Sequence, residues 1–451
     1  MREYGTFLKT NSDGVLEFEG MSTVALAEKY GTPLFVTSEN TIRHNYRQFR
    51  KAFTDVYPEE VIVCVGMKAN WGLAVRRVVV QEGGGGDAFG LGELTVSMLA
   101  GSDPSKIVIN GCNKTEETLI TAIDTETLIQ FDHIYELEDI DRLTKKLGKK
   151  ARVSARIRLP LDSIADIVYK DPRYPEGISP TFWERTFKYG MEPESFYEAV
   201  KIADKMEMVS FEGAMYHGGL PRRAGFYYEE TKELVEVVAN AKDQFGWSPK
   251  YLNIGGGFVP IRYGADVPPT AEEYAKGIIE AIVPTCEERN MKVPILMMEP
   301  GRYCLDSSAI WLTRVGATKS DHNMAMKNWV YVDGHVNEMS DPFDPRSRVH
   351  HVVIANDDNR DGEKVKVDIC GQTCNAADVV AKAVTMPEMK KGDLLAFLDV
   401  GAYNEPFSDQ SNVLPRSATV MISGDRAAVV RRRETITDIL SRDSIPSWLM
   451  S

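Results

Sequence analysis

Residues 61–70 read V-I-V-C-V-G-M-K-A-N, an apolar run that leads through Met67 into Lys68. A run this rich in Val and Ile is typical of a strand buried on both faces. A lysine at the end of such a strand is costly to desolvate, so it must reach water, pair with a carboxylate or be covalently occupied. For a lone lysine, reaching water is the commonest of these outcomes. The rest of the chain therefore has to favour one of the other two.

Apolar runs of this kind recur and alternate with amphipathic helical stretches. The expected strands are Val61–Met67, Gly86–Phe89, Ile107–Asn110, Leu128–Phe131, Arg152–Ile157, Phe211–Tyr216, Leu252–Ile254 and Ile295–Met298. The expected helices include Gly92–Ala100, Ile134–Leu147, Glu194–Met206, Tyr227–Phe245 and Ala271–Asn290. Eight strands separated by helices predict a parallel sheet closed into a (β/α)8 barrel. A doubly wound sheet is disfavoured because no G-x-G-x-x-G follows the first strand.

After Arg302 the pattern changes to short β-rich runs separated by turn signals, which predicts an all-β domain. The expected strands are Ile310–Ala317, Trp329–Val332, Val349–Ile354, Val365–Ile369, Leu394–Leu398, Ala418–Ile422 and Ala427–Val430. We predict an α/β chain with a barrel at residues 39–302 and an all-β domain at 303–451. Residues 1–38 are expected to join the β domain. Ile164–Pro180, which contains three prolines, predicts a long loop beside the barrel mouth.

The composition narrows the class of protein. A chain of 451 residues favours two domains, and a net charge of -13 argues against a nucleic-acid partner. The N-terminus has no apolar signal-peptide core and no run is long enough to span a membrane, so a cytoplasmic location is expected. The six cysteines form no C-x-x-C pair and are expected to be reduced. Cys370 and Cys374 match no zinc spacing with His350 and His351, so no metal site is predicted.

Polar side chains follow several of the barrel strands, at the edge where a barrel places its active site. These residues are Lys68, Asp87, Arg156, His217 and Glu299. The loop N-I-G-G-G-F at 253–258 could turn backbone N–H groups toward an anion, although a tight turn is the simpler explanation of the loop alone. E-P-G-R at 299–302 places a carboxylate and a guanidinium three residues apart, which alone could be a local salt bridge.

As an ordered set, these motifs resemble the pyridoxal-phosphate-dependent amino-acid decarboxylases with an alanine-racemase-like fold, which include the diaminopimelate, ornithine and lysine decarboxylases. The resemblance covers nearly the whole chain. Its motifs are T-P-L-F-V at 32–36, M-K-A-N at 67–70, G-E-L at 92–94, K-Y-G at 188–190, H-G-G at 217–219, N-I-G-G-G-F at 253–258, E-P-G-R at 299–302, C-N-A-A-D at 374–378 and G-A-Y at 401–403. Each motif is short, but the order is specific.

The resemblance assigns roles around the cofactor, pyridoxal 5'-phosphate. Lys68 matches the lysine that binds the cofactor aldehyde as a Schiff base. Glu299 would hydrogen-bond the pyridine nitrogen and keep it protonated, which favours loss of CO2 over racemisation. His217 would stack on the ring. The remaining expected cofactor residues are Asp87 and Arg156 near the ring and lysine, and Gly255, Gly256, Gly257, Arg302 and Tyr403 at the phosphate.

The resemblance also implies a homodimer with shared active sites. Cys374 matches a cysteine that these enzymes contribute across the dimer interface as the acid that protonates Cα. Each site would then combine Lys68 of one chain with Cys374 of the other, so the isolated monomer should be inactive.

The substrate pocket departs from the family pattern. Asn375 follows the cysteine, where the relatives usually carry an acid, and a neutral amide cannot neutralise a distal ammonium. The segment after Val332 lacks the arginine that would bind the second carboxylate of diaminopimelate, although Arg346 lies just beyond it. Asp341 and Asp344 are equally well explained as acids that receive a distal cation and as turn formers.

These features favour α-decarboxylation of a basic diamino acid of the ornithine or lysine type, or of a specialised relative. The alternatives are a diaminopimelate decarboxylase, an amino-acid racemase of the same fold and a non-catalytic homologue. The expected substrate residues are Asp341, Asp344 and Asn375. The presence of Lys68 and Glu299 speaks against the non-catalytic reading.

Overall fold

A computed structural model describes residues 2–159, 188–218, 224–260, 268–321, 327–339 and 350–450. The chain divides into two compact units. One is built from Arg43–Ile261 and Asp266–Cys304, and the other mainly from Met1–Ile42 and Leu305–Ser451. The sequence predicts boundaries after residues 38 and 302. We call the two parts the barrel unit and the β-rich unit.

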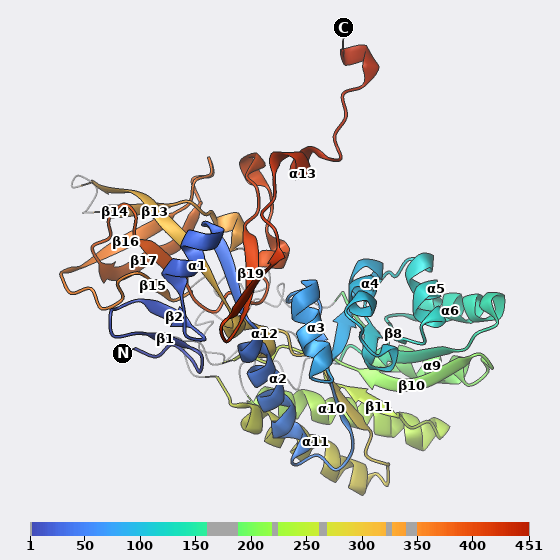
Figure 1. Cartoon of the computed structure of the whole chain (residues 1–451). Coiled ribbons are helices and arrows are strands. Elements are labelled where there is room, and N and C mark those ends of the chain that lie inside the picture. Colours follow the sequence, from blue (N-terminus) through green and yellow to red (C-terminus); the bar gives the residue numbers. More distant parts are fainter. Residues whose placement is uncertain are drawn as a thin grey trace. The chain divides into compact units, whose positions relative to one another are not determined.

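Parallel strands close into a barrel in the described part of the barrel unit, as the sequence predicts (Figure 1). They are β5 (Val61–Gly66), β6 (Gly85–Ala88), β7 (Ile107–Ile109), β8 (Leu128–Phe131), β9 (Ala151–Arg156), β10 (Val209–Met215), β11 (Tyr251–Asn253) and β12 (Ile295–Met298). Strand β12 pairs with β5 and so closes the barrel. The (β/α)8 prediction is therefore confirmed.

Amphipathic helices connect these strands and cover the barrel. They are α2 (Glu39–Thr54), α3 (Leu73–Gln81), α4 (Leu91–Leu99), α5 (Glu116–Asp124), α6 (Ile134–Leu147), α9 (Pro193–Ala203), α10 (Ala224–Phe245) and α11 (Ala271–Glu288). Their ends carry ordinary signals. A capping box between Thr270 and Glu273 starts α11, and Gly148 in the left-handed conformation ends α6.

The core of the barrel explains why β5 is apolar throughout. Every residue of β5 is buried. Ile62 and Cys64 belong to an interior cluster with Val108, Leu128 and Met297, which come from other strands. The alternate residues of β5 are buried as well, so its continuous apolar run matches a strand covered on both faces.

The glycines before and within β6 let it approach its neighbours closely. A Cβ at Gly85 would lie inside van der Waals contact with the carbonyl oxygen of Lys106, which directly precedes β7. A Cβ at Gly84 would lie 2.7 Å from a methyl carbon of Val79 on α3. Small residues here therefore allow β6 to place Asp87 inside the ring of strands.

The β-rich unit contains a sheet that includes a strand from the N-terminal segment. Its main path runs β17-β16-β14-β13-β4-β19-β20, and β15 and β18 pair alongside. The strands are β4 (Leu34–Ser38), β13 (Ala309–Asp321), β14 (Lys327–Val332), β15 (Val352–Ile354), β16 (Lys364–Cys370), β17 (Val379–Pro387), β18 (Leu394–Phe397), β19 (Ala418–Ser423) and β20 (Arg426–Arg431). Because β4 lies between β13 and β19, the N-terminal segment joins this sheet as predicted.

The smaller elements of this unit flank the sheet. Strands β1 (Leu8–Thr10), β2 (Leu16–Phe18) and β3 (Met21–Ser22) form a separate antiparallel sheet. Helices α1 (Thr23–Tyr30) and α13 (Ile436–Leu440) also belong to this unit, whereas α12 (Arg302–Leu305) lies at the boundary, with its first three residues in the barrel unit.

Alternating side chains of β13 serve both faces of the sheet. Trp311 packs into one apolar cluster, while Ile310 and Leu312 pack into the other. Beyond Val315 the strand becomes exposed, yet it continues to Asp321 because it pairs with β14. The sequence predicts that this strand ends at residue 317, because the exposed part carries no apolar signal.

Strand β17 is a strand that the sequence analysis misses. It pairs antiparallel with β16, with register shifts, and contains Ala383 at a φ of 57°. The segment V-V-A-K-A-V-T-M-P has β-branched residues in both halves, but Ala-Lys-Ala interrupts them, and the strand is defined by its pairing with β16. The predicted loop Ile164–Pro180 lies outside the described residues. Among those described, no helix is both long and apolar enough to cross a membrane.

Candidate active site

Lys68 lies just past the end of β5 and contacts a buried carboxylate. Its Nζ is 2.6 Å from Oδ2 of Asp87, and the Asp87 side chain is fully buried while that of Lys68 is 26% exposed. The amine also lies 5.1 Å from the centre of the Phe89 ring. Of the three outcomes open to this lysine, the structure shows pairing with a carboxylate, at the end of the barrel where an active site is expected.

Two buried asparagines join Asp87 to Glu299. The Nδ2 of Asn110 donates to Oδ1 of Asp87 at 2.7 Å and to Oε1 of Glu299 at 3.1 Å. The Nδ2 of Asn253 donates to the same Oε1 at 2.7 Å. Because both amides donate to one oxygen of Glu299, its second oxygen is not engaged by them. The network links β6, β11, β12 and the end of β7.

The two carboxyl groups of this network differ in proton affinity. Burial alone would raise the pKa of Asp87, but the charge of Lys68 and hydrogen bonds from Lys68 and Asn110 outweigh burial and hold it below its usual range. Burial and the negative charge of Asp87 raise the pKa of Glu299 to about 7. Asp87 therefore stays ionised beside Lys68, while Glu299 exchanges its proton near neutral pH.

The glycine loop after β11 lies against His217 and Glu299. A Cβ at Gly255 would come within 2.6 Å of the Cβ of His217, and a Cβ at Gly256 would overlap the carbonyl oxygen of Glu299. Gly255 and Gly257 also have positive φ values of 69° and 91°. Only glycine fits these positions without rearrangement.

Backbone hydrogen bonds modify the prediction that all three glycines present their N–H groups to a phosphate. The N–H of Gly255 donates to Oδ1 of Asn253 at 2.8 Å, and that of Gly256 donates to Nδ1 of His217 at 3.2 Å. In this structure, two of the three donors thus hold the loop itself. Gly257 is the position whose N–H remains the best candidate for an anion.

His217 accepts a hydrogen bond at Nδ1, which requires a neutral ring at that nitrogen. Burial, together with the charges of Arg156 and Lys68, lowers the pKa of His217 to about 3. A neutral imidazole suits the predicted role of a flat surface beside a cofactor ring better than the role of a general acid at neutral pH.

Aromatic side chains secure the far end of the glycine loop. Phe258 is fully buried and stacks on Tyr227 of α10, with ring centres 4.7 Å apart. The Tyr227 hydroxyl donates to the carbonyl oxygen of Gly256 at 2.9 Å. Phe49 of α2 packs edge-on against Phe258. The loop is therefore fixed from both sides by the outer helices.

Arg156 ends β9 and supplies a buried cation. Its guanidinium lies 4.5 Å from the ring centre of Tyr189. Among the described residues, its Nη1 is buried and has no hydrogen-bond acceptor. A buried unsatisfied donor of this kind is expected to find an acceptor on a bound ligand. Arg302, at the start of α12, is also buried.

These features fit pyridoxal phosphate. Lys68 would supply an amine for its aldehyde, and Glu299 has one carboxyl oxygen that the asparagines do not use. The unsatisfied Nη1 of Arg156 and the close-packed glycine loop suit an anionic ligand. The chemistry of this donor set therefore matches the expected cofactor.

The structure does not bring every predicted site residue to this place. Tyr403 and Cys374 belong to the β-rich unit, so their positions in the active site stay predictions. Tyr403 is buried with a φ of 63°. Asp341 and Asp344 lie outside the described residues.

Cys374 lies in an exposed loop that is held by hydrogen bonds. Its N–H donates to Oδ1 of Asn412 at 3.0 Å, and Nδ2 of Asn412 is 3.3 Å from its sulfur. Asp378 accepts from the N–H and the hydroxyl of Thr373 at 2.8 and 2.7 Å. The Oδ1 of Asn375 accepts from the N–H of Ala377 at 2.9 Å, so the predicted substrate residue also forms a turn.

Sequence reasoning assigned no role to Asn110 or Asn253. Each lies at the end of a barrel strand, and Asn253 opens the glycine motif. The only sequence signal for these two residues is their position at a strand end. Because an amide is uncharged and common in turns, that position alone does not mark it as a site residue.

Comparison with known proteins identifies relatives of the whole chain. The family described as "Pyridoxal-dependent decarboxylase, pyridoxal binding domain" matches residues 39–306. A diaminopimelate decarboxylase of Archaeoglobus fulgidus is 30% identical over 98% of this chain and 100% of its own length. One of Methanocaldococcus jannaschii is 31% identical over 97% of both chains.

Solved structures give the same grouping. The diaminopimelate decarboxylase of M. jannaschii in complex with L-lysine has a TM-score of 0.87 and 29% identity, with 98% of each chain covered. A lysine/ornithine decarboxylase of Vibrio vulnificus with putrescine has a TM-score of 0.72 and 19% identity, over 89% of this chain and 97% of its own. At that identity, the second likeness concerns the fold alone.

Replacing Glu299 by Gln should change how the stability of the cofactor-free protein depends on pH. The folded-state pKa of about 7 exceeds the 4.5 that is usual for a glutamate, so the folded state binds more protons and wild-type stability falls as pH rises through this window. Gln does not titrate. Between pH 5 and 8, the variant should therefore gain about 2 kcal/mol of unfolding free energy relative to wild type, measured by chemical denaturation.

Glu280→Gln is the matched control, because Glu280 is 57% exposed on α11. The unfolding free energy of this control, relative to wild type, should differ little between pH 5 and pH 8. If the unfolding free energies of Glu299→Gln and wild type differ by the same amount at pH 5 and at pH 8, the raised pKa of Glu299 is contradicted.

Replacing Asn110 by Ala should weaken binding of pyridoxal phosphate by about tenfold or more, because the amide that bridges two buried carboxyl groups is lost. Dissociation constants measured by fluorescence titration test this. Asn240→Ala, which removes an asparagine bonded to Arg289 away from the site, should leave the constant unchanged. Unaltered affinity in Asn110→Ala would mean that the bridge does not support the cofactor site.

Proposed function

Because the chain belongs to the family of pyridoxal-dependent decarboxylases, we propose that it releases the α-carboxyl group of diaminopimelate as CO2. The observation that carries this choice of substrate is the extent of the likeness. A relative named diaminopimelate decarboxylase matches 98% of this chain and 100% of its own length, so the likeness includes both units. The proposal replaces the preference for ornithine or lysine that the pocket sequence suggests.

A second candidate is a basic diamino acid of the lysine or ornithine type. It is favoured by the neutral Asn375 and by the absence of an arginine from residues 333–339, the described stretch that follows β14. Diaminopimelate carries a second carboxylate, which needs a cationic partner. Arg346 lies outside the described residues.

Pyridoxal phosphate, when bound, supplies an aldehyde that reacts with amines and a ring that accepts the electrons left when CO2 departs. The chain's own residues prepare this chemistry. Asp87 keeps the amine of Lys68 in place and stabilises its charged form. Glu299, whose orientation is fixed by Asn110 and Asn253, would hydrogen-bond the ring nitrogen and hold a proton there.

The neutral ring of His217 lies against the glycine loop, and Phe258 at the end of that loop is buried against Tyr227. A water-poor site strengthens the electrostatic effect of Glu299 on a bound ring. A carboxylate at the ring nitrogen favours a protonated, electron-accepting ring, which supports decarboxylation over the racemisation considered as an alternative.

Cys374 is proposed to donate the proton that replaces CO2 at Cα, in the active site of a second subunit. Its exposed position suits contact with another molecule. Asn412 and the loop bonded to Asp378 hold the thiol in a defined position. The active enzyme is accordingly proposed to be a homodimer in which each site draws on both chains.

A screen for CO2 release should identify the substrate. Purified protein loaded with pyridoxal phosphate is incubated with meso-diaminopimelate and with L- and D-lysine and ornithine. We expect the highest kcat/KM for diaminopimelate and no release by Lys68→Ala. Higher kcat/KM for lysine or ornithine would support the second candidate, whereas solvent deuterium exchange at Cα without CO2 would indicate a racemase.

Mixing two inactive variants should restore activity if the sites are shared. Lys68→Ala and Cys374→Ala, unfolded together and refolded, should give mixed dimers with one intact site, or about a quarter of wild-type activity. Each variant refolded alone is the control. Activity in the mixture that stays at the level of the single variants would contradict shared sites.

A further inference from the structure

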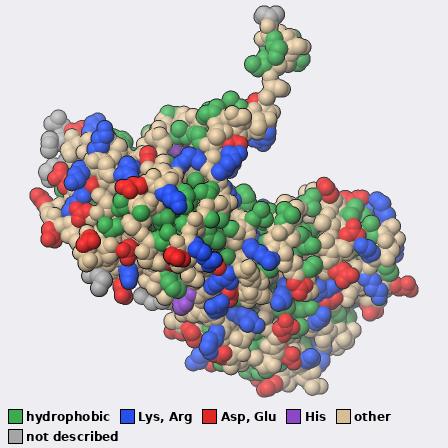
Figure 2. Space-filling view, viewed as in Figure 1, with side chains coloured by type: hydrophobic (Ala, Val, Ile, Leu, Met, Phe, Trp, Pro, Cys, Tyr) green, Lys and Arg blue, Asp and Glu red, His purple; other side chains and the backbone are tan. Residues whose placement is uncertain are grey.

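The chain's last residues expose large apolar side chains. Ile445, Trp448, Leu449 and Met450 are 65%, 76%, 67% and 71% exposed. They follow α13, and a short 3-10 helix spans Ser447–Leu449. In Figure 1 this segment extends away from α13, and Figure 2 shows apolar side chains toward its end. We call residues 441–450 the C-terminal arm.

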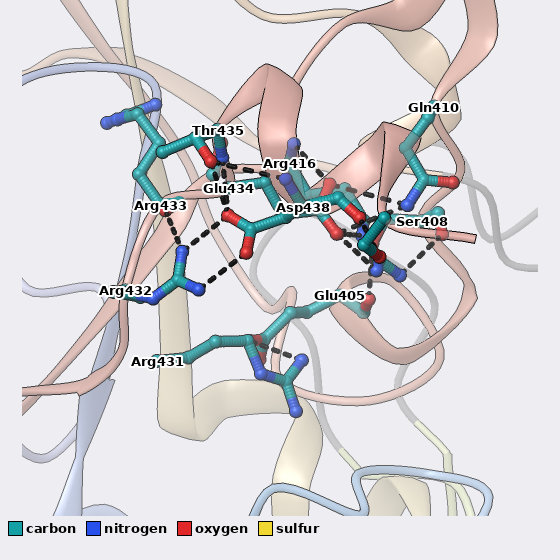
Figure 3. Close-up of polar contacts among 12 residues, drawn as sticks. Glu405, Ser408, Gln410, Arg416, Arg431, Arg432, Arg433, Glu434, Thr435 and Asp438 are labelled. Atoms are coloured by element: carbon teal, nitrogen blue, oxygen red, sulfur yellow. Dashed lines mark hydrogen bonds and ion pairs between the residues drawn. The ribbon is translucent and has the colours of Figure 1, made fainter. Parts of the chain in front are cut away.

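Ion pairs fix the base of the C-terminal arm (Figure 3). Both terminal nitrogens of Arg432 donate to Asp438 in α13, each at 2.6 Å. Thr435 and Asp438 form a capping box that starts this helix. Arg416 donates through Nε to Glu434 at 2.9 Å. The preceding strand and α13 are thus tied to the β-rich unit, which sets the direction in which the arm leaves.

A second apolar surface lies beside this base. Val429 and Val430 of β20 are 49% and 41% exposed, and Ile436 and Leu440 of α13 are each 50% exposed. In the described sheet, β20 is an edge strand and pairs with β19. We call these four residues the β20–α13 patch. An apolar edge strand of this kind is a ready surface for another chain.

The four residues of the β20–α13 patch are exposed even though the C-terminal arm is present in the structure. The arm therefore does not cover the patch of its own chain. The chain therefore carries two apolar surfaces that do not meet. Large exposed apolar groups are unfavourable in water, and joining the two surfaces would bury both.

We propose that the C-terminal arm docks on the β20–α13 patch of a second copy of this chain. A twofold axis lets each arm reach the other copy's patch at the same time, so both contacts form in one closed dimer. The anchored base suits this exchange, because a fixed direction reduces the ordering cost of docking. The proposal concerns assembly and does not depend on which amino acid is the substrate.

The first experiment measures self-association of the full chain. Trp448→Ala combined with Leu449→Ala should raise the dimer dissociation constant by at least about tenfold, as expected when a tryptophan anchor is removed. The matched control is Leu99→Ala with Tyr135→Ala, which removes side chains that are 70% and 76% exposed in the barrel unit. The control should leave the constant unchanged. Sedimentation velocity over a dilution series measures both, and circular dichroism verifies folding.

The second experiment identifies the surface that the arm touches. A photo-crosslinking amino acid replaces Trp448 in a mixture of light and heavy isotope-labelled protein. Crosslinks between light and heavy chains that map to residues 426–440 support the proposal. Crosslinks within one chain only, crosslinks to the barrel unit of the other chain, or no change in self-association would overturn it. Binding of the arm to anionic phospholipid vesicles, with unaltered self-association, would also overturn it.

Discussion

A lysine amine placed beside buried carboxyl groups is the constraint on which the barrel unit depends. Lys68 is tolerated at the end of an apolar strand because the ionised Asp87 lies 2.6 Å from its Nζ. That carboxylate in turn repels Glu299. The amide of Asn110 offsets this repulsion by donating hydrogen bonds to both carboxyl groups, and the amide of Asn253 donates to Glu299. This arrangement needs the ends of five strands, β5, β6, β7, β11 and β12, to be in register. A slip of one residue in β6 would turn Asp87 to the opposite face and leave the lysine without its partner.

The sequence predicts the barrel and the charged part of its site because both have local signals. Strands β8 and β12 have the predicted limits, since each is a short apolar run bounded by polar residues. Charged residues at strand ends could be grouped because closure of a barrel brings those ends together. The roles of Asn110 and Asn253 were not predictable in this way. An amide serves as donor or acceptor in many settings, and its partners are decided by strands far apart in the chain.

Other features depend on contacts that no single stretch encodes. The glycines after β11 predict an anion-binding loop, yet His217 and Asn253 take two of the backbone donors because the loop packs against them. Strand β17 has β-branched residues in both halves, but its irregular centre, around Ala383, depends on pairing with β16. The substrate prediction rested on Asn375, on the segment after Val332 without an arginine and on Asp341 and Asp344, whereas relatives that match the whole chain are named diaminopimelate decarboxylases. Specificity at the distal end of a substrate depends on how several loops meet, which motifs do not describe.

The position of β4 has a consequence for the order of events during synthesis. This strand leaves the ribosome before the barrel strands, but its neighbours in the sheet are Ala309–Leu312 of β13 and Ala418–Ile422 of β19. The strands that close the barrel are all translated between β4 and these partners. The barrel is therefore expected to fold first, as an insertion within the β-rich unit. Until β13 and β19 have been translated, the apolar β4 lacks both neighbouring strands, and its unpaired backbone offers a binding surface to a nascent-chain chaperone.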